Sequence, residues 1–287
     1  MNTRIKPYIM LLPAATVLIG ILAFGITTAL LQSFGYMPII GLKEFTIKYY
    51  AEIFKDSTFM QSFLFSLGIS VTSSIIAVIF GVVLAYSLLT RKAMKNLEKI
   101  IYMVPIIVPH MAAAFFMFNI FSQSGLLSRV MFNLHIISSQ GDFPVLIFDK
   151  YGIGIVLTYL WKEIPFVAMV VYIFFRGINK ELITAAVNLG ASRAQCFFNV
   201  LLPISMPSIL SSFIIIFAFS FGAFEVPYLL GPTIPKTLPV QAYIEYTSPD
   251  IFNRPHAMAL NIVLVAISIL LVWFYDKALV RVCREVD

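Results

Sequence analysis

Six long apolar segments, separated by shorter polar stretches, make up most of the chain. They cover approximately residues 8–31, 63–89, 100–121, 153–175, 209–230 and 257–280. A helix needs about 20 predominantly apolar residues to cross the hydrocarbon core of a bilayer, and each segment can supply such a helix. The pattern predicts an all-α membrane protein with six transmembrane helices.

The first apolar segment follows Arg4 and Lys6, as the apolar core of a secretory signal peptide would. Its apolar run is about twice as long as such a core, and no small-residue cleavage site follows it before Phe34. We therefore expect this segment to be retained as the first transmembrane helix.

The composition also places the chain in a lipid bilayer. Apolar residues make up 60% of the 287 positions, charged residues 12%, and the mean hydropathy is +0.93. Soluble domains are about one quarter charged, and a soluble chain of this size could not bury so much apolar surface. The net charge of +6 comes from basic residues scattered between apolar segments, so it does not indicate nucleic acid as a partner.

The basic residues predict the orientation of the chain. Six helices put both termini on one side, and with that side inside, the inner segments carry 12 basic residues against 7 in the outer loops. The inner residues are Arg4, Lys6, Arg91, Lys92, Lys95, Lys99, Arg176, Lys180, Arg193, Lys277, Arg281 and Arg284. The outer residues are Lys43, Lys48, Lys55, Arg129, Lys150, Lys236 and Arg254. The positive-inside rule therefore favours cytoplasmic termini.

The residues that usually carry catalysis or bind metals are few and scattered. Cys196 and Cys283, and the histidines at 110, 135 and 256, show no spacing typical of a zinc site or a disulfide framework. The sequence has no Gly-x-x-x-x-Gly-Lys-Ser/Thr loop, so it carries no ATP site of its own. We expect no catalytic residue, no metal and no cofactor, which argues against a membrane enzyme.

The inner loop between the fourth and fifth apolar segments, residues 177–205, has the most specific pattern. Asn179 can cap a short helix, and Glu181 lies in its first turn, where the helix dipole favours an anion. Gly190 suits the left-handed residue that ends a helix. We expect a first short helix between these positions.

A second short helix follows in the same loop. Ser192 and Gln195 form a capping-box pattern at its start, and Pro203 is expected to end it. Neither helix is long enough to cross a bilayer. An interfacial hairpin without a partner would carry basic and bulky aromatic residues. The first helix is instead rich in alanine and nearly uncharged, which favours docking on another protein.

This loop resembles the cytoplasmic EAA loop of permease subunits of type I ATP-binding-cassette importers. That loop reads Glu-Ala-Ala, three residues, Gly, about nine residues, then an aliphatic residue and Pro. Here Thr184-Ala185-Ala186, Gly190-Ala191 and Leu202-Pro203 stand at the matching spacing. Thr184 departs from the usual glutamate, which puts any salt bridge made by that glutamate in doubt. Six spans, with the loop before the last two, agree with the resemblance.

The resemblance implies a MetI-like permease fold formed by one domain over residues 1–287, with several spans in the bacterial inner membrane. It implies as partners two ATPase subunits, a second and non-identical permease, and an extracytoplasmic substrate-binding protein. It also implies a set of residues that couple the chain to the ATPase: Glu181, Thr184, Ala185, Ala186, Gly190, Ala191, Leu202 and Pro203.

Residues 221–255 resemble permeases of the spermidine/putrescine-type branch, which implies a polyamine or another small cationic solute. Four polar residues near or inside the spans are candidates for the pathway, because charged and polar groups are costly there and are often functional. They are Lys162, Glu163, Glu225 and His110. The alternative for each is a structural role, since a buried polar side chain can simply bind its neighbours.

Two further features bear on these alternatives. Lys162 and Glu163 point about 100° apart on a helix, so they cannot both bind one neighbour. Pro105, Pro109 and Pro165 break backbone hydrogen bonds, so their carbonyl partners need other donors. An ion-coupled secondary transporter is the rival function, and it would usually show inverted repeats, which this sequence lacks.

Overall fold

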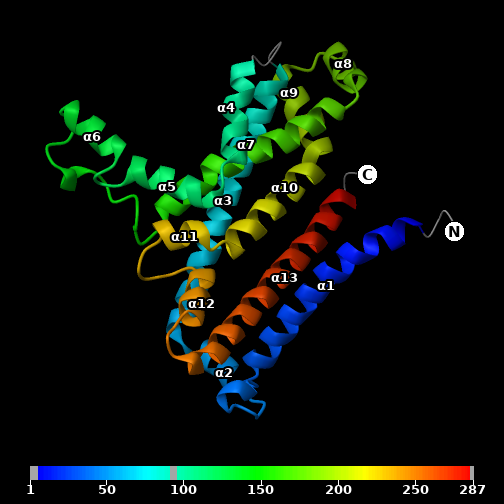
Figure 1. Ribbon diagram of the computed structural model, residues 1–287. Helices are drawn as coiled ribbons and strands as arrows, with labels where there is room; N and C mark the ends of the chain where they lie inside the picture. The colour runs from blue at the N-terminus through cyan, green and yellow to red at the C-terminus, as the bar shows by residue number, and fades with distance from the viewer. Residues whose placement is uncertain (1–5, 91–95, 285–287) are drawn as a thin grey trace. The chain divides into compact units, whose positions relative to one another are not determined.

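The structure is a computed structural model that describes residues 6–90 and 96–284. These residues are predominantly helical, as Figure 1 shows. The α-helices are α1 (Lys6–Ser33), α2 (Lys48–Lys55), α3 (Ser57–Thr90), α4 (Asn96–Ile107), α5 (His110–Phe121), α6 (Leu126–Asn133), α7 (Ile153–Gly177), α8 (Lys180–Asn188), α9 (Arg193–Cys196), α10 (Leu202–Gly222), α11 (Glu225–Leu230), α12 (Leu238–Tyr246) and α13 (Arg254–Arg284). The shorter turns are the 3₁₀ helices η1 (Pro38–Ile40), η2 (Gln140–Asp142) and η4 (Ile251–Asn253) and the π-helical turn η3 (Phe197–Leu201).

Within the described residues, six helical stretches are long and apolar enough to cross a membrane. They are Met10–Ser33, Ser57–Thr90, His110–Asn133, Ile153–Gly177, Arg193–Gly222 and Ile251–Tyr275. The prediction of an all-α chain with six membrane helices is therefore confirmed. Arg4, Arg91, Lys92 and Lys95, which carry part of the orientation argument, lie outside the described residues.

The third apolar segment is not one helix, contrary to the prediction. It is divided into α4 and α5 by Val108 and Pro109. Pro109 takes an extended conformation (φ −57°, ψ 147°) and precedes the first residue of α5. A proline has no N–H to donate and disfavours helical geometry in the residue before it, so the chain turns at this point.

The fifth apolar segment is broken in the same way, where one helix over 209–230 was expected. α10 starts earlier, at Leu202, and ends at Gly222, and Glu225 begins the separate helix α11. Ala223 is extended between them (φ −70°, ψ 136°). Pro227 could not donate to the carbonyl of Ala223 in a continuous helix, which accounts for the position of the break.

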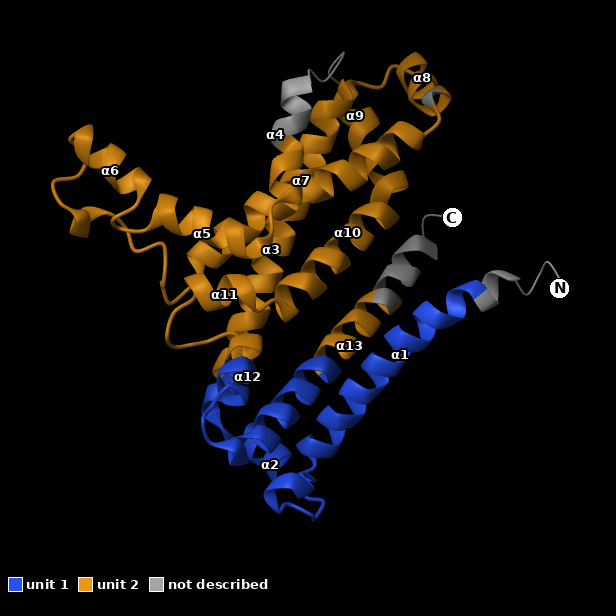
Figure 2. Cartoon of the chain, viewed as in Figure 1, with its two compact units in different colours: residues 1–60, 241–266 blue, residues 61–240, 267–287 orange. Residues whose placement is uncertain are grey.

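The described chain divides into two compact units, coloured in Figure 2. The first contains the described residues up to Met60 together with Gln241–Ala266. In this unit the hydroxyl of Tyr50 donates to Ser33 Oγ at 2.7 Å, and His256 Nδ1 lies 2.6 Å from Glu245 Oε2. The prediction of one permease domain over the whole chain stays a prediction.

The second unit holds residues 61–240 and 267–284 and is built around α7. Half of the apolar span of α7 is buried, and α7 packs against α4, α5, α10 and α11. Its start is fixed by Asp149, whose carboxylate accepts the N–H groups of Tyr151 (2.9 Å) and Ile153 (2.7 Å). α7 therefore carries its polar residues into the middle of this unit.

Candidate functional site

The first half of the 177–205 loop folds as the sequence predicts. Asn179 caps α8, because its Oδ1 accepts the N–H of Glu181 at 3.0 Å. The carboxylate of Glu181 lies in the first turn of the helix and accepts from Asn179 Nδ2 at 3.1 Å. This cap satisfies a backbone donor that the helix itself leaves unpaired.

The other end of α8 is closed by a Schellman motif. Gly190 is left-handed (φ +87°), and its N–H donates to the carbonyl of Val187 at 2.9 Å. The N–H of Ala191 donates to the carbonyl of Ala186 at 3.0 Å. These two bonds satisfy carbonyls at the helix end and fix the direction in which the chain leaves it.

The capping box at the start of α9 is also confirmed. Ser192 N–H donates to Gln195 Oε1 at 2.8 Å, and Gln195 N–H donates to Ser192 Oγ at 3.3 Å. The expectation that Pro203 ends this helix is wrong, because α9, η3 and α10 follow one another without an extended residue. In η3 the N–H of Leu202 donates five residues back to Phe197, and this wider register accommodates a proline that has no N–H.

The segment is held to the core of the second unit by aromatic contacts. The ring of Phe197 lies 4.5 Å from that of Tyr86 on α3 and 6.5 Å from that of Phe175 on α7. Ile178 and Leu201, at the two ends of the segment, are buried in the same cluster. The loop is thus attached to the helices that it connects.

The helix α8 presents a mostly uncovered surface. Leu182, Val187 and Leu189 are exposed, as are the small side chains of Thr184 and Ala185. Ala186 and Ala191 are half-buried, and Ile183 packs against the core. A short, rigidly capped helix with an apolar and small-residue surface can bind into a groove of another protein.

A second group of predicted residues lies inside the second unit, where α7 meets α4, α5 and α10. Lys162 is buried, and its ammonium donates to the backbone carbonyls of Pro105 (3.0 Å) and Val108. Pro105 is four residues before Pro109, so its carbonyl is the one for which Pro109 has no N–H. Lys162 therefore satisfies the carbonyls at the break and at the negative end of α4.

Glu163 binds a different helix. It is 5% exposed, and its Oε1 accepts from Ser220 Oγ on α10 at 2.5 Å. Its Oε2 is buried and has no hydrogen-bond partner among the described residues. The expected divergence of the two neighbouring side chains is thus observed.

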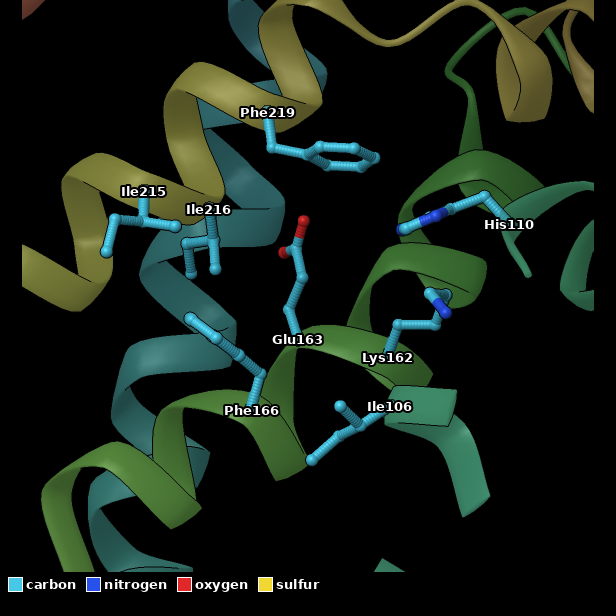
Figure 3. Close-up of a pocket in the computed structure, with 8 residues that line it drawn as sticks. All are labelled: Ile106, His110, Lys162, Glu163, Phe166, Ile215, Ile216 and Phe219. Carbon is cyan, nitrogen blue, oxygen red and sulfur yellow. The ribbon is translucent and has the colours of Figure 1, made fainter. Parts of the chain in front are cut away.

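A cavity of about 210 Å³ lies beside these groups. Figure 3 shows its lining, with Glu163, Phe219 and His110 reaching the same space from α7, α10 and α5. The ring of His110 lies 4.4 Å from that of Phe219. Glu225 is exposed at the start of α11. The structure therefore gathers three of the four candidate pathway residues, Lys162, Glu163 and His110, around one cavity, and Glu225 lies outside its lining.

Sequence reasoning missed Ser220 and the particular carbonyls that Lys162 binds. Ser220 carries no local signal, since it is one of several serines in an apolar segment and lies 57 residues from Glu163. The unpaired carbonyl of Pro105 could have been predicted, because Pro109, four residues later, has no N–H to donate to it.

Comparisons with known proteins agree on the class of protein. Residues 77–282 match the family of binding-protein-dependent transport system inner membrane components. The chain is 27% identical over 201 residues to a probable molybdenum ABC transporter permease of Haloferax volcanii, covering 69% of this chain and 68% of the relative. It is 25% identical over 237 residues to the spermidine/putrescine permease protein PotB of Escherichia coli, covering 82% of each.

A solved structure shows the same fold. A chain of a bacterial ABC transporter involved in the import of the acidic polysaccharide alginate superposes with a TM-score of 0.81, covering 97% of each chain. The sequences are 19% identical, so this likeness concerns the fold. The MetI-like permease fold expected from the sequence is therefore confirmed.

Proposed function

Because the chain belongs to the family of binding-protein-dependent transport system inner membrane components, we propose that it forms one half of the solute pathway of its importer. Membership of this family makes it a multi-pass permease subunit of an ATP-binding-cassette importer in the bacterial inner membrane. Two ATPase subunits, a second and non-identical permease and an extracytoplasmic binding protein complete the importer. ATP hydrolysis belongs to the ATPase subunits. An ion-coupled secondary transporter, the alternative left by the sequence, is not favoured by the family match.

The observation that carries this proposal is α8, capped at both ends and attached to the core. The ATPase receives α8 in a surface groove, with Thr184, Ala185 and Ala186 at the contact. Asn179 and Gly190 keep the helix from fraying, so a displacement at its surface moves it as one body. The Phe197 contacts pass that displacement to α3 and α7.

The segment from Gly190 to α10 completes this coupling element. Ala191 lies in the turn after α8, and Leu202 and Pro203 continue from η3 into α10. Because no extended residue separates these elements, rotation of α9 is transmitted directly along α10. This continuity replaces the helix end at Pro203 that the sequence had suggested.

The proposed substrate is a polyamine or another small cationic solute. The support is the similarity to permeases named for spermidine and putrescine and the exposed carboxylate of Glu225 at the break between α10 and α11. Relatives named for molybdate or molybdenum stand against it. A carboxylate near the path lowers the energy of a passing cation and raises that of an anion.

Purification with the ATPase and binding protein encoded beside this chain, followed by reconstitution into liposomes, tests the proposal. We expect ATP-dependent uptake of radiolabelled 1,4-diaminobutane that needs all partners. A chain that neither binds an ATPase nor supports any ATP-dependent uptake would contradict the permease role in this assembly. Uptake of molybdate without uptake of the diamine would contradict only the substrate.

The role of Glu225 is tested separately. Glu225→Gln keeps the size and hydrogen-bonding groups of the side chain and removes its charge. Slower diamine uptake with unchanged affinity of the isolated binding protein is expected, since that protein is another chain. If Glu225 instead only closes the outer end of the pathway through its hydrogen bonds, Glu225→Gln would be tolerated, while Glu225→Ala would raise ATP hydrolysis in the absence of solute. Wild-type uptake by the Gln variant would remove this residue from the pathway.

A further inference from the structure

A groove of about 400 Å³ lies on the surface of the second unit, between α3 and the start of α7. Leu64, Gly68 and Thr72 of α3 line one side of it, each four residues after the last and so on one face of the helix. Val156 and Leu157 of α7 line the other side. The three residues of α3 are exposed, so the groove is open along its length.

Gly68 gives the groove its depth. No described atom lies within 4 Å of a Cβ built on this residue, whereas Leu64 and Thr72, one turn away on either side, carry side chains. Phe65 and Ile69 form part of the same lining. A glycine inside a helix is unfavourable for the helix itself, and here the missing side chain leaves room for a hydrocarbon chain beside α3.

Both helices that form the groove are membrane spans, Ser57–Thr90 and Ile153–Gly177. The lining is largely apolar, with leucine, isoleucine, valine and phenylalanine side chains. No water is present in the core of a bilayer, so an exposed apolar groove at this position is filled by lipid chains or by another protein.

A cationic residue at one end of the groove distinguishes between these two occupants. Lys150 is part of the lining and lies three residues before the span Ile153–Gly177, where lysine and tyrosine are typical of the membrane interface. Its ammonium lies 4.9 Å from the centroid of the Tyr151 ring. The turn that carries it packs closely on α3, because a Cβ on Gly152 would lie 2.7 Å from Ile69 Cδ1.

The charge of Lys150 is not neutralised by a neighbouring side chain. Lys150 is exposed, and no described carboxylate forms an ion pair with it. The adjacent Asp149 is buried, and its carboxylate accepts the N–H groups of Tyr151 and Ile153. An unpaired ammonium at the end of an apolar groove between two membrane helices is complementary to the phosphate and the acyl chain of an anionic lipid.

We propose that this groove binds one anionic phospholipid of the surrounding bilayer. An acyl chain lies beside Gly68, between Leu64 and Leu157, and the phosphate accepts a hydrogen bond from the Lys150 ammonium. With the orientation predicted from the basic residues, this lipid belongs to the outer leaflet. The site does not include the cavity beside Lys162 and Glu163, and it is independent of the solute that the importer carries.

Photolabelling with phospholipids tests the site. The assembled importer is reconstituted into phosphatidylcholine vesicles that contain a small fraction of either phosphatidylglycerol or phosphatidylcholine with a diazirine on one acyl chain. After illumination, peptide mass spectrometry measures the labelled fraction of residues 64–72 and 150–157. We expect about fivefold more labelling by the phosphatidylglycerol probe, the factor for one basic residue near an anionic lipid. Ile79 and Val83, exposed farther along α3, should be labelled equally by both probes.

Two variants separate the head group from the acyl chain. Lys150→Gln should abolish the preference for the phosphatidylglycerol probe, and Gly68→Leu, which fills the groove, should lower labelling by both probes. Lys55→Gln and Gly20→Leu are the matched controls and should behave as the wild type, since neither residue lines the groove. Lys55 is an exposed lysine at the end of α2, and no described atom lies within 4 Å of a Cβ on Gly20.

Three outcomes would overturn the proposal. Equal labelling of the wild-type groove by both probes would show only the unselective lipid contact that any membrane helix makes. A preference for phosphatidylglycerol that persists in Lys150→Gln would show that another group attracts the lipid. A groove that neither probe labels, although Ile79 and Val83 are labelled, would be covered by another protein of the importer. The first and third outcomes are measured on the wild-type complex, so they decide even if a variant does not assemble.

Discussion

Lys162 and Glu163 show how two adjacent residues can serve different purposes. The ammonium of Lys162 satisfies carbonyls of a broken helix, a structural task that any conformation with this break requires. Glu163 holds α10 through one oxygen and keeps the other free. The two side chains leave α7 about 100° apart, so the hydrogen bonds that Lys162 makes to the broken helix do not involve Glu163.

The first prediction concerns Lys162. Replacement by methionine keeps the length of the side chain but leaves two buried carbonyls without their donor. We expect a loss of about 2 kcal/mol or more in stability, because each unsatisfied buried group costs about 1–3 kcal/mol. The thermal unfolding midpoint of the purified protein in detergent should fall by several degrees.

Lys277→Met is the matched control for this substitution. Lys277 is exposed and lies over the ring of Trp273 at 4.0 Å, so its replacement should cost about 1 kcal/mol or less. An unchanged midpoint for Lys162→Met would show that other donors satisfy the break.

At the scale of elements, the sequence predicted what neighbouring residues determine. The caps at Asn179, Gly190 and Ser192 depend on residues two to five positions away, and each formed as expected. The break at Pro109 and the continuity at Pro203 could not be told apart in this way. Both prolines lack a donor, and only the π-helical turn before Pro203 lets the helix continue.

The second prediction tests the contact between α3 and α7. A Cβ on Gly81 would lie 2.7 Å from Val167 Cβ and 3.2 Å from the carbonyl oxygen of Ile164. Gly81→Ala should therefore lower the unfolding midpoint, since overpacking costs about 1–3 kcal/mol. On the same helix, no described atom lies within 4 Å of a Cβ at Gly68. Gly68→Ala should leave the midpoint unchanged or raise it, and equal losses in both would contradict the close contact.

The third prediction concerns the end of α8. Gly190→Ala forces a side chain into a left-handed conformation at a cost of about 1 kcal/mol, although no described atom lies within 4 Å of the added carbon. The helix end should loosen while the protein stays folded. We expect less diamine uptake for each ATP hydrolysed by the reconstituted importer, and more so for Gly190→Leu, which also obstructs the docking surface.

Gly41 provides a control with the same local strain. It is left-handed (φ +88°), also has no described atom within 4 Å of an added Cβ, and lies between η1 and α2 rather than in the 177–205 loop. Gly41→Ala should leave the ratio of uptake to ATP hydrolysis unchanged. If both variants lower the ratio equally, the effect is general strain and not loss of coupling.

For the molecule as a whole, the apolar pattern predicted six spans but not what covers them. The span Met10–Ser33 has no residue of its most apolar window buried within the described chain. Leu18, Ile19 and Leu22 on this helix are well exposed. Side chains this apolar need lipid or another protein around them. A single sequence contains no information about a partner's surface, so this part of the structure lay beyond prediction.

The last prediction is that the importer contains one copy of this chain and one different permease. Thr184 stands where the resemblance expects a glutamate, so two copies of this chain would give an importer in which neither coupling loop carries that carboxylate. A non-identical partner can supply it on one side. Two copies of this chain with different affinity tags, expressed together with the neighbouring genes, should not be purified with one another. The intact mass of the complex should account for one copy of this chain, a different permease and two ATPase subunits. Co-purification of both tags, with a mass that leaves no room for a second permease, would establish a homodimer instead.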